Sequence, residues 1–286
     1  MLKRYSSYLP DLTQSWILIM LLALAGSILG GLVSFILTLI FPGFKGWGEL
    51  IMYPLIFIPP YIAIRISLKN SAKTSVNTDY VPLSVPIDKP DFGKIGVIAT
   101  ILLTIPLVFS FNIITEPLTM WMDVPEFLKQ FLVQVQSNKI SSFIAVAVFA
   151  PILEEVFCRG IILRGLLTHM SPSKAILWSA LMFGLMHMNP WQAIPAFMLG
   201  LLMGWIYYKT HSIWIVILIH FINNGFSYLI TVFYPELPAE TGFYDLIPGM
   251  WYYISYIAAF IYTALALHLM NKYYDKTISL KIQPNS

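Results

Sequence analysis

The run SWILIMLLALAGSILGGLVSFILTLIF, residues 15–41, contains no charged side chain. A helix that spans a bilayer needs about 20 consecutive apolar residues. The apolar region of a secretory signal peptide is only about 7–15 residues long and ends at a cleavage site with small residues, and no such site stands out here. We therefore expect residues 15–41 to form a retained transmembrane helix.

The rest of the chain has the same character. Of its 286 residues, 58% are hydrophobic and 11% are charged, whereas soluble domains are about 25% charged. Further apolar segments that are long enough to span a bilayer, or nearly so, lie at 50–66, 95–114, 141–161, 174–188, 192–208, 213–233 and 249–270. The sequence thus predicts an all-α, polytopic protein of about eight transmembrane helices, folded as a single membrane domain over residues 1–286.

The distribution of positive charge predicts the orientation of these helices. If the chain starts inside the cell and crosses the bilayer eight times, fourteen of its 17 Lys and Arg residues lie inside, beginning with Lys3 and Arg4. Only Lys45, Lys129 and Lys139 then lie outside. Because cytoplasmic loops carry an excess of Lys and Arg, this split predicts that both termini are cytoplasmic.

Two classes of function are disfavoured by composition. The net charge of +3 is small and dispersed, so nothing points to a nucleic-acid partner. The single cysteine, Cys158, excludes an internal disulfide framework and a multi-cysteine metal site. Its flanking residues, Phe157 and Arg159, give no sign of an activated nucleophile.

Polar side chains of types that can take part in catalysis gather in the second half of the chain. Glu154, Glu155 and Arg159 lie on segment 141–161, His187 on segment 174–188, and His220 with Asn224 on segment 213–233. An ionisable group at the centre of a span costs about 2.5–3.5 kcal/mol on insertion scales and is therefore a functional candidate. We expect scaffold helices over 15–114, a catalytic core over 141–233 and a final helix over 249–270.

Helical spacing suggests how these groups are arranged. Glu155 and Arg159 are four residues apart and can form an ion pair along one helix, which leaves Glu154 free to face a cavity. His220 and Asn224 have the same spacing and share a face. Each group alone has an ordinary interpretation, as a charge at a helix end or as a hydrogen-bonding clamp between helices. Together they indicate a shared site, in which a glutamate can act as a general base.

The three motifs resemble those of a known family. E-E-x-x-x-R at 154–159, F-x-x-x-H at 183–187 and H-x-x-x-N at 220–224 occur in order, on separate predicted helices within residues 141–227. In this pattern the chain resembles the CPBP intramembrane proteases, which include the type II CAAX prenyl endopeptidase and bacterial bacteriocin-processing and self-immunity proteins. The resemblance implies an intramembrane endopeptidase of the bacterial cell membrane that acts on a peptide or a membrane-associated protein.

The same resemblance implies roles for the site residues. Glu154 is the expected general base and acts with His187 on the attacking water. His220 and Asn224 are expected to stabilise the oxyanion, with Glu155 and Arg159 in support. The need for a metal is left open: if one is present, Glu154, His187 and His220 are its candidate ligands and Zn²⁺ is the candidate ion, although no H-E-x-x-H motif occurs.

Three further points follow from the sequence. One alternative function is a non-catalytic bacteriocin-immunity or peptide-binding scaffold that uses the same cavity, and another is a proton-coupled carrier, in which glutamate and histidine relay protons. Gly200 and Gly204 form a Gly-x-x-x-Gly pattern that favours close helix packing. Pro190 directly follows the His187 region and marks a possible early helix end.

Overall fold

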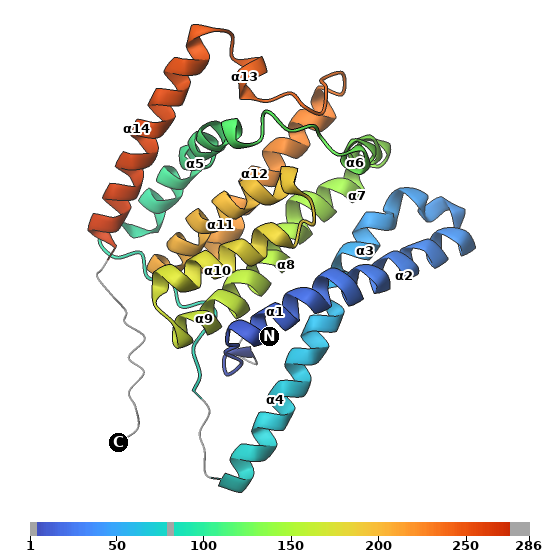
Figure 1. The fold of residues 1–286 in the computed structure, drawn as a ribbon, viewed down its shortest axis with the longest axis vertical. Coiled ribbons are helices and arrows are strands. Elements are labelled where there is room, and N and C mark those ends of the chain that lie inside the picture. Colours follow the sequence, from blue (N-terminus) through green and yellow to red (C-terminus); the bar gives the residue numbers. More distant parts are fainter. Residues whose placement is uncertain (1–4, 79–82, 275–286) are drawn as a thin grey trace.

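The structure is a computed structural model that describes residues 5–78 and 83–274. Within these two ranges every regular element is a helix (Figure 1), which confirms the all-α, polytopic prediction. Lys3, Arg4, Lys276 and Lys281, which enter the argument for orientation, lie outside the described residues. The cytoplasmic placement of both termini stays a prediction.

The first apolar run forms one long helix, as expected. It is built from α1 (Leu12–Met20), a π-helical stretch η2 (Leu21–Gly26) and α2 (Ser27–Ile40). Asp11 caps its start: the Asp11 side chain accepts a bond from the Gln14 amide at 2.8 Å, and the Gln14 side chain accepts one from the Asp11 amide. This reciprocal capping box satisfies two amides that no helical carbonyl can reach.

The chain then turns back along this helix. A 3-10 turn η3 (Pro42–Trp47) leads into α3 (Gly48–Ile56) and α4 (Ile58–Thr78), and α2 and α3 lie side by side (Figure 1). A side chain at Gly26 would occupy the position of the Ile56 carbonyl. Glycine at 26 is therefore what permits the close crossing that holds α3 in place.

The second half contains the remaining helices. In chain order these are α5 (Gly96–Thr115), η4 (Glu116–Leu118), α6 (Glu126–Ser137), α7 (Lys139–Ser142), η5 (Phe143–Phe149), α8 (Ala150–Glu155), η6 (Val156–Leu163), α9 (Arg164–His169), α10 (Pro172–Leu185), α11 (Pro190–Thr210), α12 (Ile213–Phe233), α13 (Phe243–Leu246) and α14 (Met250–Tyr273). Helices α8 to α12 form the centre of the molecule, with α5 and α14 on one side and α1 to α4 on the other (Figure 1).

Six helices in the described residues are long and apolar enough to cross a membrane. They are Leu12–Ile40, Gly48–Lys73, Gly96–Leu118, Lys139–His169, Ile213–Phe233 and Met250–Tyr273. Helix α10 has 14 residues, fewer than a full span needs, and α11 does not reach the same apolar content. A multi-pass membrane protein is confirmed, and the count of eight crossings is not.

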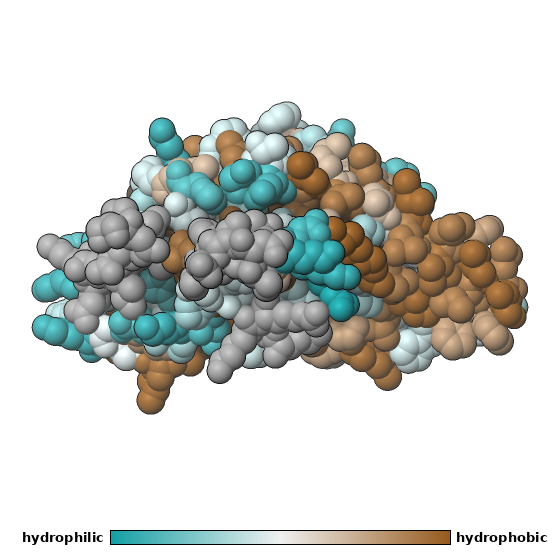
Figure 2. All heavy atoms as spheres, turned by 90° about the horizontal axis from the view of Figure 1, so that it is seen from below, coloured by the Kyte–Doolittle hydropathy of each residue, from teal (hydrophilic) through white to brown (hydrophobic). Residues whose placement is uncertain are grey.

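The surface explains why the protein needs lipid as a solvent. Along α2 the large apolar side chains Ile28, Leu32, Phe35 and Leu39 are between 55% and 70% exposed. Hydrophobic residues gather at the right-hand end of the face in Figure 2, which is seen from below Figure 1. A soluble protein does not expose an apolar surface of this extent.

A buried arginine joins the two halves of the fold. Arg164 is 2% exposed and is the first residue of α9. It donates to the backbone carbonyls of Tyr5, Ser6, Tyr8, Val85 and Gly160. Its charge is thus solvated by carbonyl dipoles from three separate segments of the chain.

We expect Arg164→Lys to lower the free energy of unfolding by about 1–3 kcal/mol, because an ammonium group cannot reach all five carbonyls and leaves some unpaired. Unfolding of the purified protein in detergent micelles measures the loss. The matched control is Arg65→Lys, at an exposed position on α4, which should leave stability unchanged. Equal stability of the two variants would contradict the structural role of Arg164.

Candidate active site

Both glutamates lie on an α-helical stretch between two π-helical ones. α8 carries Glu154 and Glu155, and it is preceded by η5 and followed by η6. Pro151, in the first turn of α8, has no amide hydrogen, so the carbonyl five residues earlier, of Val146, lacks its π-helical donor. That carbonyl instead accepts a bond from the Asn224 side chain of α12, at 3.0 Å. The irregular backbone therefore binds a side chain of the predicted site.

Glu155 forms the centre of a buried charge cluster. Its Oε1 accepts bonds from Arg159 Nη1 at 2.8 Å and from His220 Nδ1 at 2.9 Å. The Glu155 and Arg159 side chains are fully buried. The ion pair expected from their spacing is confirmed, and its additional link to His220 on α12 was not foreseen from the sequence.

Phe183 connects this cluster to the second histidine. The Arg159 Cζ lies 4.3 Å from the centre of the Phe183 ring, in a cation–π contact. The rings of His187 and His220 meet the same phenyl ring edge-on, with centroids 5.3 and 5.6 Å away. The three motifs predicted from sequence therefore converge around one aromatic side chain.

Arg159 is further held by the neighbouring helix. Its Nη2 donates to the carbonyl of Gly200 on α11, at 3.2 Å. A Cβ at Gly200 would lie 3.2 Å from Ala180 of α10, so the glycine allows α10 and α11 to approach closely. This agrees with the packing role expected for the Gly-x-x-x-Gly pattern.

His187 lies just beyond the end of α10, not within a long helix. α10 ends at Leu185, Met188 has a positive φ of 56°, and Asn189 caps α11. The early end suggested by Pro190 is thus confirmed. His187 Nδ1 lies 2.9 Å from the Phe183 carbonyl, which can only accept a hydrogen bond. Nδ1 therefore carries a proton, and Nε2 of the neutral ring has a free lone pair.

Glu154 points into the protein and not into lipid. The residue is 5% exposed, and its Oε1 accepts a hydrogen bond from the Tyr53 hydroxyl. Its Oε2 is buried and has no partner among the described residues. Tyr53 lies on α3, within the region 15–114 that was predicted to hold only scaffold helices. No sequence signal distinguishes it from other tyrosines in apolar segments.

Asn224 ends a chain of side-chain amides. Asn112 of α5 donates to Asn223 at 2.9 Å, and Asn223 donates to Asn224 at 3.1 Å. The Asn224 side chain donates one N–H to the Val146 carbonyl and has a second N–H available. The ladder fixes the orientation of the Asn224 amide, and no sequence pattern predicted that Asn112 and Asn223 contribute to it.

The candidate metal ligands do not form a coordination site in this arrangement. Over residues 5–78 and 83–274, no three His, Cys, Asp or Glu side chains are grouped so that they could hold a metal ion. His220 Nδ1 and Glu155 are bonded to each other, and Glu154 is bonded to Tyr53. Within the described part of the chain, these bonds leave Nε2 of both histidines and Oε2 of Glu154 unengaged, and a metal-binding histidine ordinarily donates its other ring N–H in this way.

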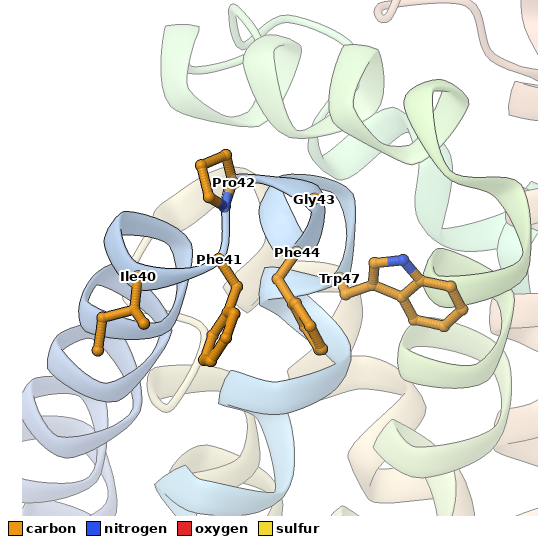
Figure 3. A pocket seen from close by; sticks show the side chains of 6 residues that line it. All are labelled: Ile40, Phe41, Pro42, Gly43, Phe44 and Trp47. Carbon is orange, nitrogen blue, oxygen red and sulfur yellow. The ribbon is translucent and has the colours of Figure 1, made fainter.

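A surface depression of about 650 Å³ lies elsewhere, at the turn between α2 and α3 (Figure 3). It is lined by Ile40, Phe41, Pro42, Gly43, Phe44 and Trp47. The Phe41 and Phe44 side chains point the same way, whereas the Trp47 ring turns aside (Figure 3). Since none of these residues carries a titratable or nucleophilic group, we do not assign the chemistry to this depression.

Comparison with known proteins agrees with the geometry. Residues 136–226, about a third of the chain, match a protein family described as type II CAAX prenyl endopeptidase Rce1-like. Searches among curated proteins and solved structures found no match. The matched segment contains all three motifs and the side chains that meet at Phe183. This match and these motifs support a CPBP family intramembrane protease.

Proposed function

We propose that the protein is an intramembrane endopeptidase in which Glu154 is the general base. The observation that carries the proposal is that Glu154 is 5% exposed and that its Oε2 is without a partner among the described residues. On the same helix, Glu155 joins the His220 cluster. A buried base of this kind can take a proton from water in a site from which bulk solvent is excluded.

The proposed reaction is direct hydrolysis. Glu154 Oε2 takes a proton from a water molecule, and the water oxygen attacks the carbonyl carbon of the peptide bond. The lone pair on His187 Nε2 accepts a hydrogen bond from the same water and orients it. When the tetrahedral intermediate collapses, the C–N bond breaks, and the proton held by Glu154 passes to the leaving amine.

The oxyanion of that intermediate needs donors. Asn224 retains one N–H, because only one is used by Val146. His220 is held through Nδ1, so its Nε2 is free, and a protonated ring can donate from it while Glu155 balances the charge. Donors that are fixed before the reaction stabilise developing charge without reorganisation.

The substrate class follows from the setting of the site. We infer a peptide, or a segment of a membrane-associated protein, that reaches the site from the bilayer or its interface. The family match supports a CAAX-type protease, and the motif resemblance supports a bacterial cell membrane as the location. The experiment below compares prenylated with unprenylated substrates. No step of the proposed mechanism uses a metal, and the chelation arm of the experiment decides whether one is needed.

The test is cleavage of a peptide library by protein reconstituted in lipid vesicles, with products identified by mass spectrometry. Prenylated and unprenylated members are compared, with and without a chelator. The proposal requires products with wild-type protein, none with Glu154→Gln, and no effect of chelation. Binding without cleavage would favour the scaffold alternative, and loss on chelation that zinc restores would establish a metal enzyme.

We expect Asn224→Ala to lower kcat by about 10²–10³-fold with little change in KM, because it removes an oxyanion donor that acts in the transition state. Steady-state kinetics on the best library peptide measures both constants. Asn70→Ala, an exposed amide on α4, is the matched control and should match wild type. A change confined to KM would contradict the oxyanion role.

A further inference from the structure

We propose that Tyr53 of α3 is a positioning residue for the catalytic carboxylate, an inference that rests on the proposed function. Tyr53 lies 101 residues from Glu154 in the chain and outside the matched segment 136–226. Its hydroxyl is the hydrogen-bond partner of Glu154 Oε1. The first helices would then complete the active site and not only support it.

The position of Tyr53 is fixed by the packing of α3. This helix contacts η5, which precedes the glutamates. The Tyr53 ring lies 6.1 Å from Phe57, and Phe57 meets Phe157 edge-on at 5.7 Å. Phe157 belongs to η6, directly after α8. Aromatic contacts thus join α3 to the helix that carries Glu154.

The hydrogen bond makes the two carboxylate oxygens unequal. A phenol O–H that donates to Oε1 occupies that oxygen and stabilises its negative charge. Oε2 is left as the free oxygen that can receive a proton from water. Without Tyr53 the carboxyl group can rotate, and the proportion of molecules with a correctly placed base falls. Because this affects the chemical step and not substrate contact, kcat should change and KM should not.

The experiment compares Tyr53→Phe with Tyr61→Phe. Tyr61 lies on α4, its ring is 6.3 Å from Phe157, and the substitution makes the same chemical change without touching Glu154. We expect Tyr53→Phe to lower kcat by about 10–100-fold at unchanged KM, the range for a hydrogen bond to a charged group. Tyr61→Phe should retain the wild-type kcat and KM.

Glu154→Gln in the same series separates failure of this inference from failure of the proposed function. Activity in Glu154→Gln would end the proposed function itself. An inactive Glu154→Gln with a fully active Tyr53→Phe would overturn only the role of Tyr53, and so would an effect on KM alone. Thermal unfolding of each variant in detergent identifies loss of fold. If Tyr53→Phe is destabilised, Tyr53→His, which retains a donor, should recover part of kcat, and no recovery would also overturn the role.

Discussion

Glu154→Gln should lower kcat for peptide hydrolysis by about 10²–10⁴-fold, the contribution of a general base. Glutamine has the shape of glutamate and can still accept the Tyr53 hydrogen bond, but its amide cannot take a proton from water. KM should change little, because the side chain acts on water and not on the ground-state substrate. Initial rates with the best library peptide, measured in vesicles, give both constants.

The control removes a carboxylate by the same substitution at a position outside the site. Glu126 is exposed in the first turn of α6, and Glu126→Gln should retain wild-type rates. Hydrolysis by Glu154→Gln within a few fold of wild type would show that another group is the base. Thermal unfolding of both variants establishes that the comparison concerns folded protein.

Arg159→Met should destabilise the protein by about 3–5 kcal/mol, the range for removing one partner of a buried ion pair. The substitution leaves Glu155 fully buried with His220 as its remaining ionic partner. Methionine has a similar length, so the loss reflects charge more than volume. Denaturant unfolding in detergent micelles measures the change.

Arg65→Met makes the same exchange at an exposed site and should be close to neutral. A double substitution, Arg159→Met with Glu155→Leu, should recover much of the lost stability, because it removes the uncompensated charge. It should not recover activity, since His220 would lose its anchor. Equal stability of Arg159→Met and wild type would show that Glu155 is not ionised in the folded protein.

Local spacing was sufficient to predict part of the site. The Glu155–Arg159 pair lies on one helix, four residues apart, and helical geometry alone brings such side chains together. The apolar run at 15–41 predicted a helix because a chain in lipid must satisfy its backbone polar groups internally. The prediction that the three motifs share one site rested on the gathering of ionisable groups on three spans and on the family resemblance, because local spacing does not specify contacts between helices.

The remaining features of the site depend on contacts between segments that are distant in the sequence. Nothing near Tyr53 in the sequence indicates a carboxylate 101 residues away, because helix packing and not periodicity decides that contact. The π-helical stretches η5 and η6 change the angle between successive side chains, so a 3.6-residue period misjudges the faces of this helix. The amide ladder from Asn112 to Asn224 is likewise visible only in three dimensions.

The carbonyl cage around Arg164 has a consequence for how the protein loses its structure. Its oxygens come from the segment before α1, from the segment before α5 and from the helix that bears the glutamates. Separating any of these segments leaves a cation without ligands in a region poor in water. The two halves should therefore melt together, in one cooperative transition, although only the second contains the family motifs.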